Sequence, residues 1–175
     1  MRWSDFIAGK WRKASKQTDA AEEGLVSRLQ LGARGERLAA ERLRALGYTL
    51  VVSNFSINVG RNLRGAVVST EIDLIAYDGD TLCFVEVKTR ASDWFAPPEA
   101  NVDLRKRRQI ARAARAYRRM FGLTDAHYRY DVVSVIIPSD PAEDVALRPR
   151  VEVLRNFWRD DVFRKRRWTD HEYDS

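Results

Sequence analysis

The spacing of hydrophobic positions changes from a helical period to a strand period along the chain, and this predicts a domain that contains both helices and strands. From Leu31 to Gly47 the residues favour a helix, and Gly47 supplies a usual C-terminal stop. At about 100° per residue, Glu36 falls on the same stripe as several small apolar residues, so it lies on or beside the buried face. The next residues, Tyr48 to Asn54, predict a strand.

Two β-rich runs follow, Glu71 to Tyr77 and Thr81 to Thr89, separated by the hairpin turn signal Asp-Gly-Asp. Between the first strand and this hairpin, Phe55 to Ser69 carries two glycines, and we expect a long loop or flexible insertion there. The later elements expected are a helix over 102 to 121, a strand from Tyr128 to Ile137, a short strand from Val151 to Leu154 and a basic helix from Asp160 to Arg167.

This order of elements indicates an α/β (α+β) domain whose mixed central β-sheet is flanked by helices. We divide the chain into an N-terminal extension over 1–31, partly helical or disordered, a domain over 32–158, and a basic C-terminal helix or tail over 159–175.

The amino-acid composition excludes several classes of protein. The 175 residues are 45% hydrophobic and 32% charged, as in a folded globular protein. No run approaches the roughly 18 apolar residues of a membrane span, and the first residues lack the apolar segment of a secretory signal, so we expect a cytoplasmic protein with no membrane partner. One cysteine excludes an internal disulfide and a multi-cysteine zinc site.

The charge balance favours a polyanionic partner. There are 31 Lys and Arg against 25 Asp and Glu, which gives a net charge of +6. Nucleic acid is the partner that such a balance suggests, although a basic surface without any partner explains the number equally well.

Three charged residues of the predicted hairpin form a candidate catalytic group. Asp73 lies in its first strand, and Glu86 and Lys88 lie in its second. Because side chains alternate along a strand, Glu86 and Lys88 share one face while Val85 and Val87 share the other. If Asp78 pairs with Thr81 across the turn, Asp73 stands directly opposite Glu86; in the alternative register the two are diagonal neighbours. Either register brings two carboxylates together.

Facing carboxylates repel, so such a pair needs a proton, a cation or a metal ion between them. Mg²⁺ fits, because it prefers oxygen ligands and is often held by one or two carboxylates plus substrate phosphate. Lys88 would then lie beside the attacking water, where it would orient it or help to deprotonate it. The alternative is a solvent-facing salt bridge, an ordinary decoration of a half-exposed strand.

The two predicted helices add further candidates. Glu36 either joins Asp73 and Glu86 around a metal ion or interacts with the dipole of its own helix. On the later helix, Lys106 falls at the inward edge. Five arginines gather on the opposite face of that helix, where they would suit phosphate contacts or form a solvated surface: Arg105, Arg108, Arg112, Arg115 and Arg119.

In combination, these segments resemble the YraN family of bacterial proteins, relatives of restriction-endonuclease-like nucleases with PD-(D/E)xK motifs. The matching pieces, in order, are GERLAAERLRALGY, EIDLIAYDGDTLCFVEVKTR, VDLRKRRQIARAA and RYDVV. The resemblance implies a restriction-endonuclease-like core with a Mg²⁺ site, Mn²⁺ being the alternative ion. It implies that Asp73 and Glu86 bind the metal, that Lys88 assists the water and that Glu36 completes the site, as in Holliday-junction resolvases. Val87 is assigned to the same metal site.

The resemblance also implies that Lys106 contacts DNA phosphate, and we place Arg105, Arg108 and Arg112 in the same nucleic-acid interface. Our first hypothesis is therefore a metal-dependent endonuclease that hydrolyses phosphodiester bonds in DNA, including branched or structured DNA. The second is a non-catalytic module that binds nucleic acid on a nuclease-like fold. A substrate of two strands would favour a homodimer.

Overall fold

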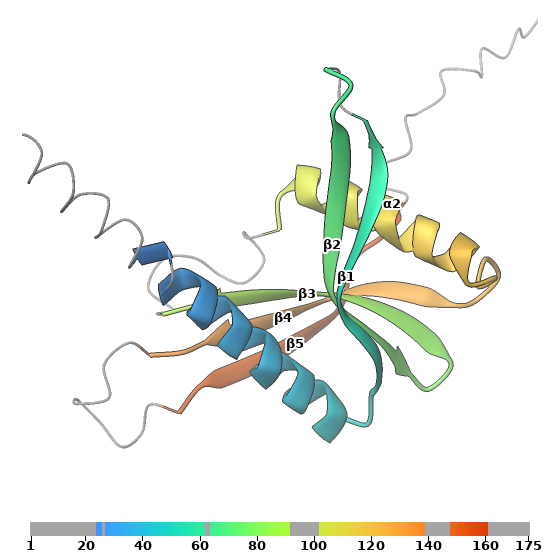
Figure 1. Ribbon diagram of the computed structural model, residues 1–175. Helices are drawn as coiled ribbons and strands as arrows, with labels where there is room; N and C mark the ends of the chain where they lie inside the picture. The colour runs from blue at the N-terminus through green and yellow to red at the C-terminus, as the bar shows by residue number, and fades with distance from the viewer. Residues whose placement is uncertain (1–23, 26, 62–63, 92–101, 139–147, 161–175) are drawn as a thin grey trace, which may run out of the picture.

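A five-stranded mixed sheet forms the centre of the protein. The computed structural model describes residues 24–25, 27–61, 64–91, 102–138 and 148–160. Within these residues the strands are β1 (Thr49–Arg61), β2 (Val67–Asp78), β3 (Thr81–Arg90), β4 (Tyr128–Ile136) and β5 (Arg150–Trp158). They lie in the order of the sequence, and only β3 and β4 run parallel. Figure 1 shows the helix α2 (Leu104–Met120) in the crossover that this parallel pair needs.

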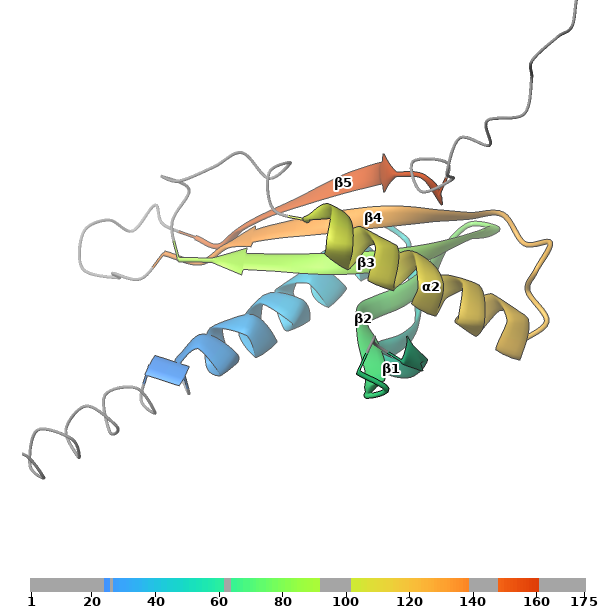
Figure 2. The same ribbon diagram turned by 90° about the horizontal axis from the view of Figure 1, so that it is seen from above.

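The sheet lies between two helices, so the expected mixed sheet flanked by helices is confirmed (Figures 1 and 2). Alternate residues of β3 point to opposite layers. Leu82 and Phe84 pack with α2 residues such as Ile110. Cys83 and Val85 pack with the N-terminal helix, which covers residues 27–45, through its small residues Ala39 and Ala40 and through Leu43. The result is an α/β fold consistent with a restriction-endonuclease-like core.

The register of the central hairpin follows one of the two expected alternatives. Asp78 pairs with Thr81, and the paired residues continue to Leu74 and Val85. Beyond Leu74, β2 pairs with β1 but not with β3. The two strands therefore rise together as a two-stranded arm beside α2, which Figure 1 shows in green above the remaining strands. The sheet opens at the position of Asp73.

The expected loop from Phe55 to Ser69 is wrong. β1 continues to Arg61 and β2 begins at Val67, so most of this segment forms the arm. Register shifts between Leu50 and Val52 and between Asn58 and Gly60 interrupt the pairing. Between these shifts, however, Phe-Ser-Ile-Asn-Val alternates apolar with polar residues, and its apolar side packs against the α2 layer. The glycines obscured a strand period that was present.

The other elements differ from expectation mainly in length. The N-terminal helix already includes residues 27–30, and it ends where Gly47 adopts a φ of +89°, as the stop signal predicted. β5 has nine residues rather than the four expected. The expected terminal helix lies outside the described residues, except for Asp160. In the part of the chain that the structure describes, neither helix is long and apolar enough to cross a membrane.

Candidate active site

The opening between β2 and β3 is closed by a side chain. Asp73 Oδ2 accepts a hydrogen bond of 2.6 Å from the main-chain N–H of Val87. This bond takes the place of the main-chain pairing that stops at Leu74 and Val85. It brings the carboxyl of Asp73 to the segment of β3 that carries Glu86 and Lys88, as the hairpin register required.

Glu86 is buried between two lysines. Only 2% of its side chain is exposed, and each of its oxygens faces a different ammonium group. Oε1 accepts a hydrogen bond of 2.6 Å from Lys88 Nζ, which comes from the same strand face. Oε2 lies 3.2 Å from Lys106 Nζ, which reaches down from the first turn of α2. Glu86 and Lys88 share one strand face as predicted, and their ion pair is the contact that the alternative interpretation expected, although Glu86 is buried. Lys106 lies at the inward edge of its helix as predicted.

Asp73 holds its proton unusually tightly. Burial, and after it the neighbouring charge of Glu86, raises the pKa of Asp73, which lies at about 7. The hydrogen bond from Val87 and the charge of Lys106 act in the opposite direction. A carboxyl whose pKa is raised by burial and by a second carboxylate is typical of functional sites, though structural ion-pair networks also produce such shifts.

Glu36 approaches the group from the other layer. It is half-buried in the middle of the N-terminal helix, and its charge also raises the pKa of Asp73. The approach depends on Gly35, which is buried against Thr89 at the end of β3. A Cβ on Gly35 would lie 2.7 Å from Thr89 Cγ2 and 2.8 Å from Thr89 Cβ, closer than real Cβ atoms come. The absence of a side chain therefore sets how deeply this helix docks.

The donor atoms present suit a hard divalent cation. Among the described residues, no three His, Cys, Asp or Glu side chains form a metal-binding group, so Glu36 is not brought in as a third ligand. Mg²⁺ needs only one or two carboxylates, with water or phosphate completing its six ligands. Glu86 Oε2 is buried and accepts no hydrogen bond from the described part of the chain. Asp73, Glu86 and the main chain of Val87 are the groups that would hold such an ion.

The N-terminus of α2 departs from the usual charge pattern. Asp103 caps the helix, its Oδ1 accepting a hydrogen bond of 2.7 Å from Lys106 N, but the first turn contains no acidic residue. Helix N-termini normally attract acidic side chains, whereas here the first turns carry Arg105, Lys106 and Arg108. The five arginines expected on the outer face of α2 are all exposed. This end of the helix is suited to an external anion.

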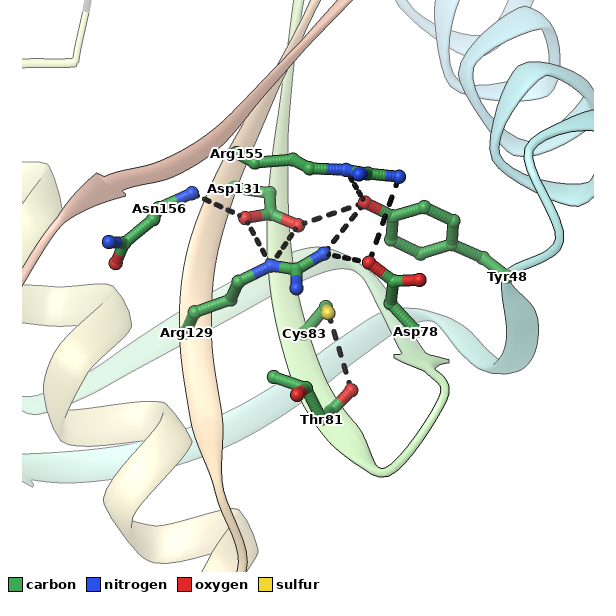
Figure 3. A network of polar contacts seen from close by, with 8 residues as sticks. All are labelled: Tyr48, Asp78, Thr81, Cys83, Arg129, Asp131, Arg155 and Asn156. Carbon is green, nitrogen blue, oxygen red and sulfur yellow. Dashed lines mark hydrogen bonds and ion pairs between the residues drawn. The ribbon is translucent and has the colours of Figure 1, made fainter.

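A second polar cluster, which the sequence did not reveal, lies toward the turn between β2 and β3 (Figure 3). Its centre is Asp131, which is fully buried in the middle of β4. Arg129 Nε donates to both oxygens of Asp131 at 3.0 Å, and its NH2 group donates to Asp78 Oδ2 at 2.6 Å. The same NH2 group lies 2.8 Å from the hydroxyl of Tyr48.

This cluster also fixes a bulge in β5. Asn156 N donates to Asp131 Oδ1 at 2.8 Å, and Asn156 has a φ of +51°. Between the pairs that flank this bond, β5 advances by four residues while β4 advances by two. Arg129 lies two residues from Asp131 in the same strand, whereas Tyr48 and Asn156 are distant in sequence. Its position does not bring it to Asp73 or Glu86, because alternate residues of β4 place it on the side of the N-terminal helix.

Comparison with known proteins identifies the family of this chain. The sequence model described as "Uncharacterised protein family UPF0102" matches residues 35–135, more than half of the chain. The protein belongs to the UPF0102 family. This is the YraN family that the motifs resembled.

Relatives carry the same family name. A UPF0102 protein of Geobacter sulfurreducens is 39% identical over 126 residues, covering 72% of this chain and 86% of the relative. A UPF0102 protein of Solibacter usitatus is 44% identical over 110 residues, covering 63% of this chain and 77% of the relative. The residues matched by the UPF0102 model extend from the buried Gly35 to the last but one residue of β4 and contain every residue of the candidate site, whereas β5 lies beyond them.

Proposed function

We propose that this UPF0102 protein is a metal-dependent endonuclease that hydrolyses phosphodiester bonds in DNA. The observation that carries the proposal is the buried carboxylate of Glu86, which lies beside the protonatable carboxyl of Asp73 and between Lys88 and Lys106. Two carboxylates and two ammonium groups meet where β2 leaves β3 and where α2 begins. A group of this kind is costly to bury if its purpose is stability alone.

Each residue has a role that follows from its position. Asp73 and Glu86 would hold Mg²⁺ or Mn²⁺, which when bound lowers the pKa of water and stabilises negative charge on phosphate. Lys88, whose side chain is 29% exposed, reaches the same carboxylate from the solvent side and is placed to orient the attacking water. Glu36 strengthens the negative potential around Asp73.

The substrate side is supplied by α2. Lys106, at the first turn, lies at the carboxylate pair, and Arg105, Arg108 and Arg112 place further positive charge on the exposed face of the same helix. Such a surface binds phosphates through charge and carries no sequence information, so it fits DNA recognised by its backbone or its shape.

The test is cleavage of linear, single-stranded, flapped and four-way DNA in the presence of Mg²⁺ or Mn²⁺. Wild type is compared with Glu86→Gln and with Glu152→Gln, an exposed glutamate of β5 that undergoes the same change of charge. Loss of cleavage in Glu86→Gln alone would support the proposal and name the substrate class. Equal cleavage by all three preparations would point to a contaminating nuclease and reject the proposed site.

A second function is favoured by one observation, the row of exposed arginines on α2 without an acidic residue in its first turn. This surface would serve equally a protein that binds nucleic acid without cleaving it. Binding would then be salt-sensitive, would persist without metal and would survive Asp73→Ala. Binding without cleavage of any DNA in the panel is the result that favours this second function.

A further inference from the structure

We propose that Lys106 is an internal counter-ion of Glu86 that gives way to the divalent metal ion, so that metal binding releases Lys106 toward the phosphate of the nucleic acid. This inference rests on the proposed function and adds to it a coupling between the two ligands. It assigns Lys106 a positioning role that depends on Glu86.

The contacts of Glu86 are unequal. Lys88 makes a hydrogen bond of 2.6 Å to Oε1, with good geometry. Lys106 lies 3.2 Å from Oε2 as an ion pair, yet Oε2 accepts no hydrogen bond from the described residues. The further contact of Lys106 Nζ is a long one, 3.5 Å to the main-chain oxygen of Glu71. Of the two lysines, Lys106 is held more loosely, and its side chain is 30% exposed.

The charges explain why a metal ion would displace Lys106 from Glu86. When ionised, Asp73 and Glu86 supply two negative charges, and Lys88 and Lys106 supply two positive charges. A divalent cation at the carboxylates adds two further positive charges within a few ångströms of both ammonium groups, where like charges repel strongly. Lys106 can relieve this repulsion by turning away from Oε2, which is the oxygen that a metal ion would take.

The local structure provides a place for the released ammonium group. The main chain of Lys106 is fixed by the cap, because Lys106 N donates to Asp103 Oδ1 at 2.7 Å. Only the side chain therefore needs to move. It moves within the first turn of α2, where the helix dipole and the neighbouring arginine side chains attract an anion.

A structural ion pair and an exchangeable counter-ion predict opposite effects of Lys106→Met. If Lys106 only stabilises the site, its loss loosens Glu86 and weakens metal binding. If Lys106 competes with the metal, its loss tightens metal binding, by roughly tenfold for one charge at this distance. By linkage, the same variant loses most of the gain in DNA affinity that metal confers on wild type.

The first experiment titrates the full chain with Mn²⁺ at pH 8.5, above the pKa of about 7 of Asp73, and follows free Mn²⁺ by electron paramagnetic resonance. Wild type is compared with Lys106→Met, with Glu86→Gln and with Arg119→Met, which removes one charge at the far end of the same helix. We expect tighter binding in Lys106→Met only. Unchanged or weaker binding in Lys106→Met overturns the inference, and Lys106→Gln replaces that variant if its thermal melt shows misfolding.

The second experiment measures affinity for a four-way DNA with and without Ca²⁺, which binds oxygen ligands. We expect Ca²⁺ to increase the affinity of wild type several-fold and that of Lys106→Met much less. If wild type binds Mn²⁺ through Glu86 but Lys106→Met behaves as Arg119→Met does, the inference fails and the proposed function stands. If wild type binds no Mn²⁺, or binds it unchanged after Glu86→Gln, the proposed metal site fails with it.

Discussion

Asp73 accepts a hydrogen bond from the main-chain N–H of Val87 at the point where β2 separates from β3. A single carboxyl thus performs two tasks. It accepts a hydrogen bond from the N–H of Val87 in β3, just beyond the last paired residues of β2 and β3. It also stands beside Glu86 as a candidate metal ligand. The two tasks favour different protonation states, because the carboxyl is a better metal ligand when ionised but is less costly to bury when neutral.

The first prediction concerns stability at different pH values. The pKa of Asp73 is raised from 3.8 to about 7, so the folded protein retains a proton that the unfolded chain loses near pH 4. The free energy of unfolding therefore decreases as the pH rises from about 4 to about 7, and the loss is complete above that range. Asp73→Asn removes this cost. At pH 8 we expect the variant to be more stable than wild type by on the order of 1 to 3 kcal/mol, as measured by urea denaturation.

Asp78→Asn is the control of opposite sign. The hydrogen bond from Arg129 holds the pKa of Asp78 below its ordinary value, so the ionised carboxylate contributes stability that is present at neutral pH and lost as the pH falls through the lowered pKa. This variant should be less stable than wild type at pH 8. If both variants shift stability in the same direction at pH 8, the assignment of the buried charge to Asp73 is wrong.

The second prediction uses a matched pair of glycines in the N-terminal helix. An alanine at Gly35 would meet the side chain of Thr89 at 2.7 and 2.8 Å, whereas a Cβ at Gly32 meets nothing within 4 Å. We expect Gly35→Ala to lower the free energy of unfolding by about 1 to 3 kcal/mol. Gly32→Ala should raise it by up to about 1 kcal/mol, because alanine is the better helix former. Both are measured by urea denaturation, and Thr89→Ala should restore part of the loss only in the Gly35→Ala background.

The third prediction concerns the cluster in Figure 3. Arg129→Met leaves the fully buried Asp131 with Asn156 N and the distant hydroxyl of Tyr48 as its remaining partners in the cluster. We expect a loss of about 3 to 5 kcal/mol in chemical denaturation, because a buried charge is left unpaired. Adding Asp131→Asn should recover much of this loss, since the amide oxygen still accepts from Asn156 N. Independent, additive losses would show that Arg129 and Asp131 do not act as a pair.

Local sequence patterns predicted much of the fold. The turn Asp-Gly-Asp predicted the hairpin between β2 and β3, and helical periodicity predicted that Lys106 would lie at the inward edge of α2. The arm was missed because glycines and register shifts break the alternation of β1 into short pieces. The length of β5 was missed because its bulge depends on the side chain of Asp131, which belongs to another strand.

In the candidate site too, some features could be predicted from local sequence and others could not. The hairpin register predicted that Asp73 lies on the face of Glu86 and Lys88, although the strands separate at Asp73 and its carboxyl is linked to β3 by the hydrogen bond from Val87. The contact between Lys106 and Glu86 joins residues on two elements, and helix periodicity predicted only that the lysine would face inward. The tight docking of Gly35 on Thr89 depends on the distance between two layers, which no local pattern contains. Contacts between distant elements need the assembled fold.

The last prediction concerns the outer face of α2. It distinguishes an effect of overall net charge on DNA binding from an effect of the charges on this face. Arg108→Ala/Arg112→Ala removes two exposed charges from the outer face of α2, and Arg42→Ala/Arg44→Ala removes two exposed charges from the N-terminal helix. Affinity for duplex DNA is measured by fluorescence anisotropy in EDTA over a range of salt concentrations. If α2 contacts phosphates, the first variant binds more weakly, and the slope of log K against log salt falls by roughly 0.9 for each lost contact. The second variant should keep the wild-type slope, because its net charge changes equally but away from the interface. Equal slopes in the two variants would show that attraction is diffuse and that α2 is not the DNA-binding face.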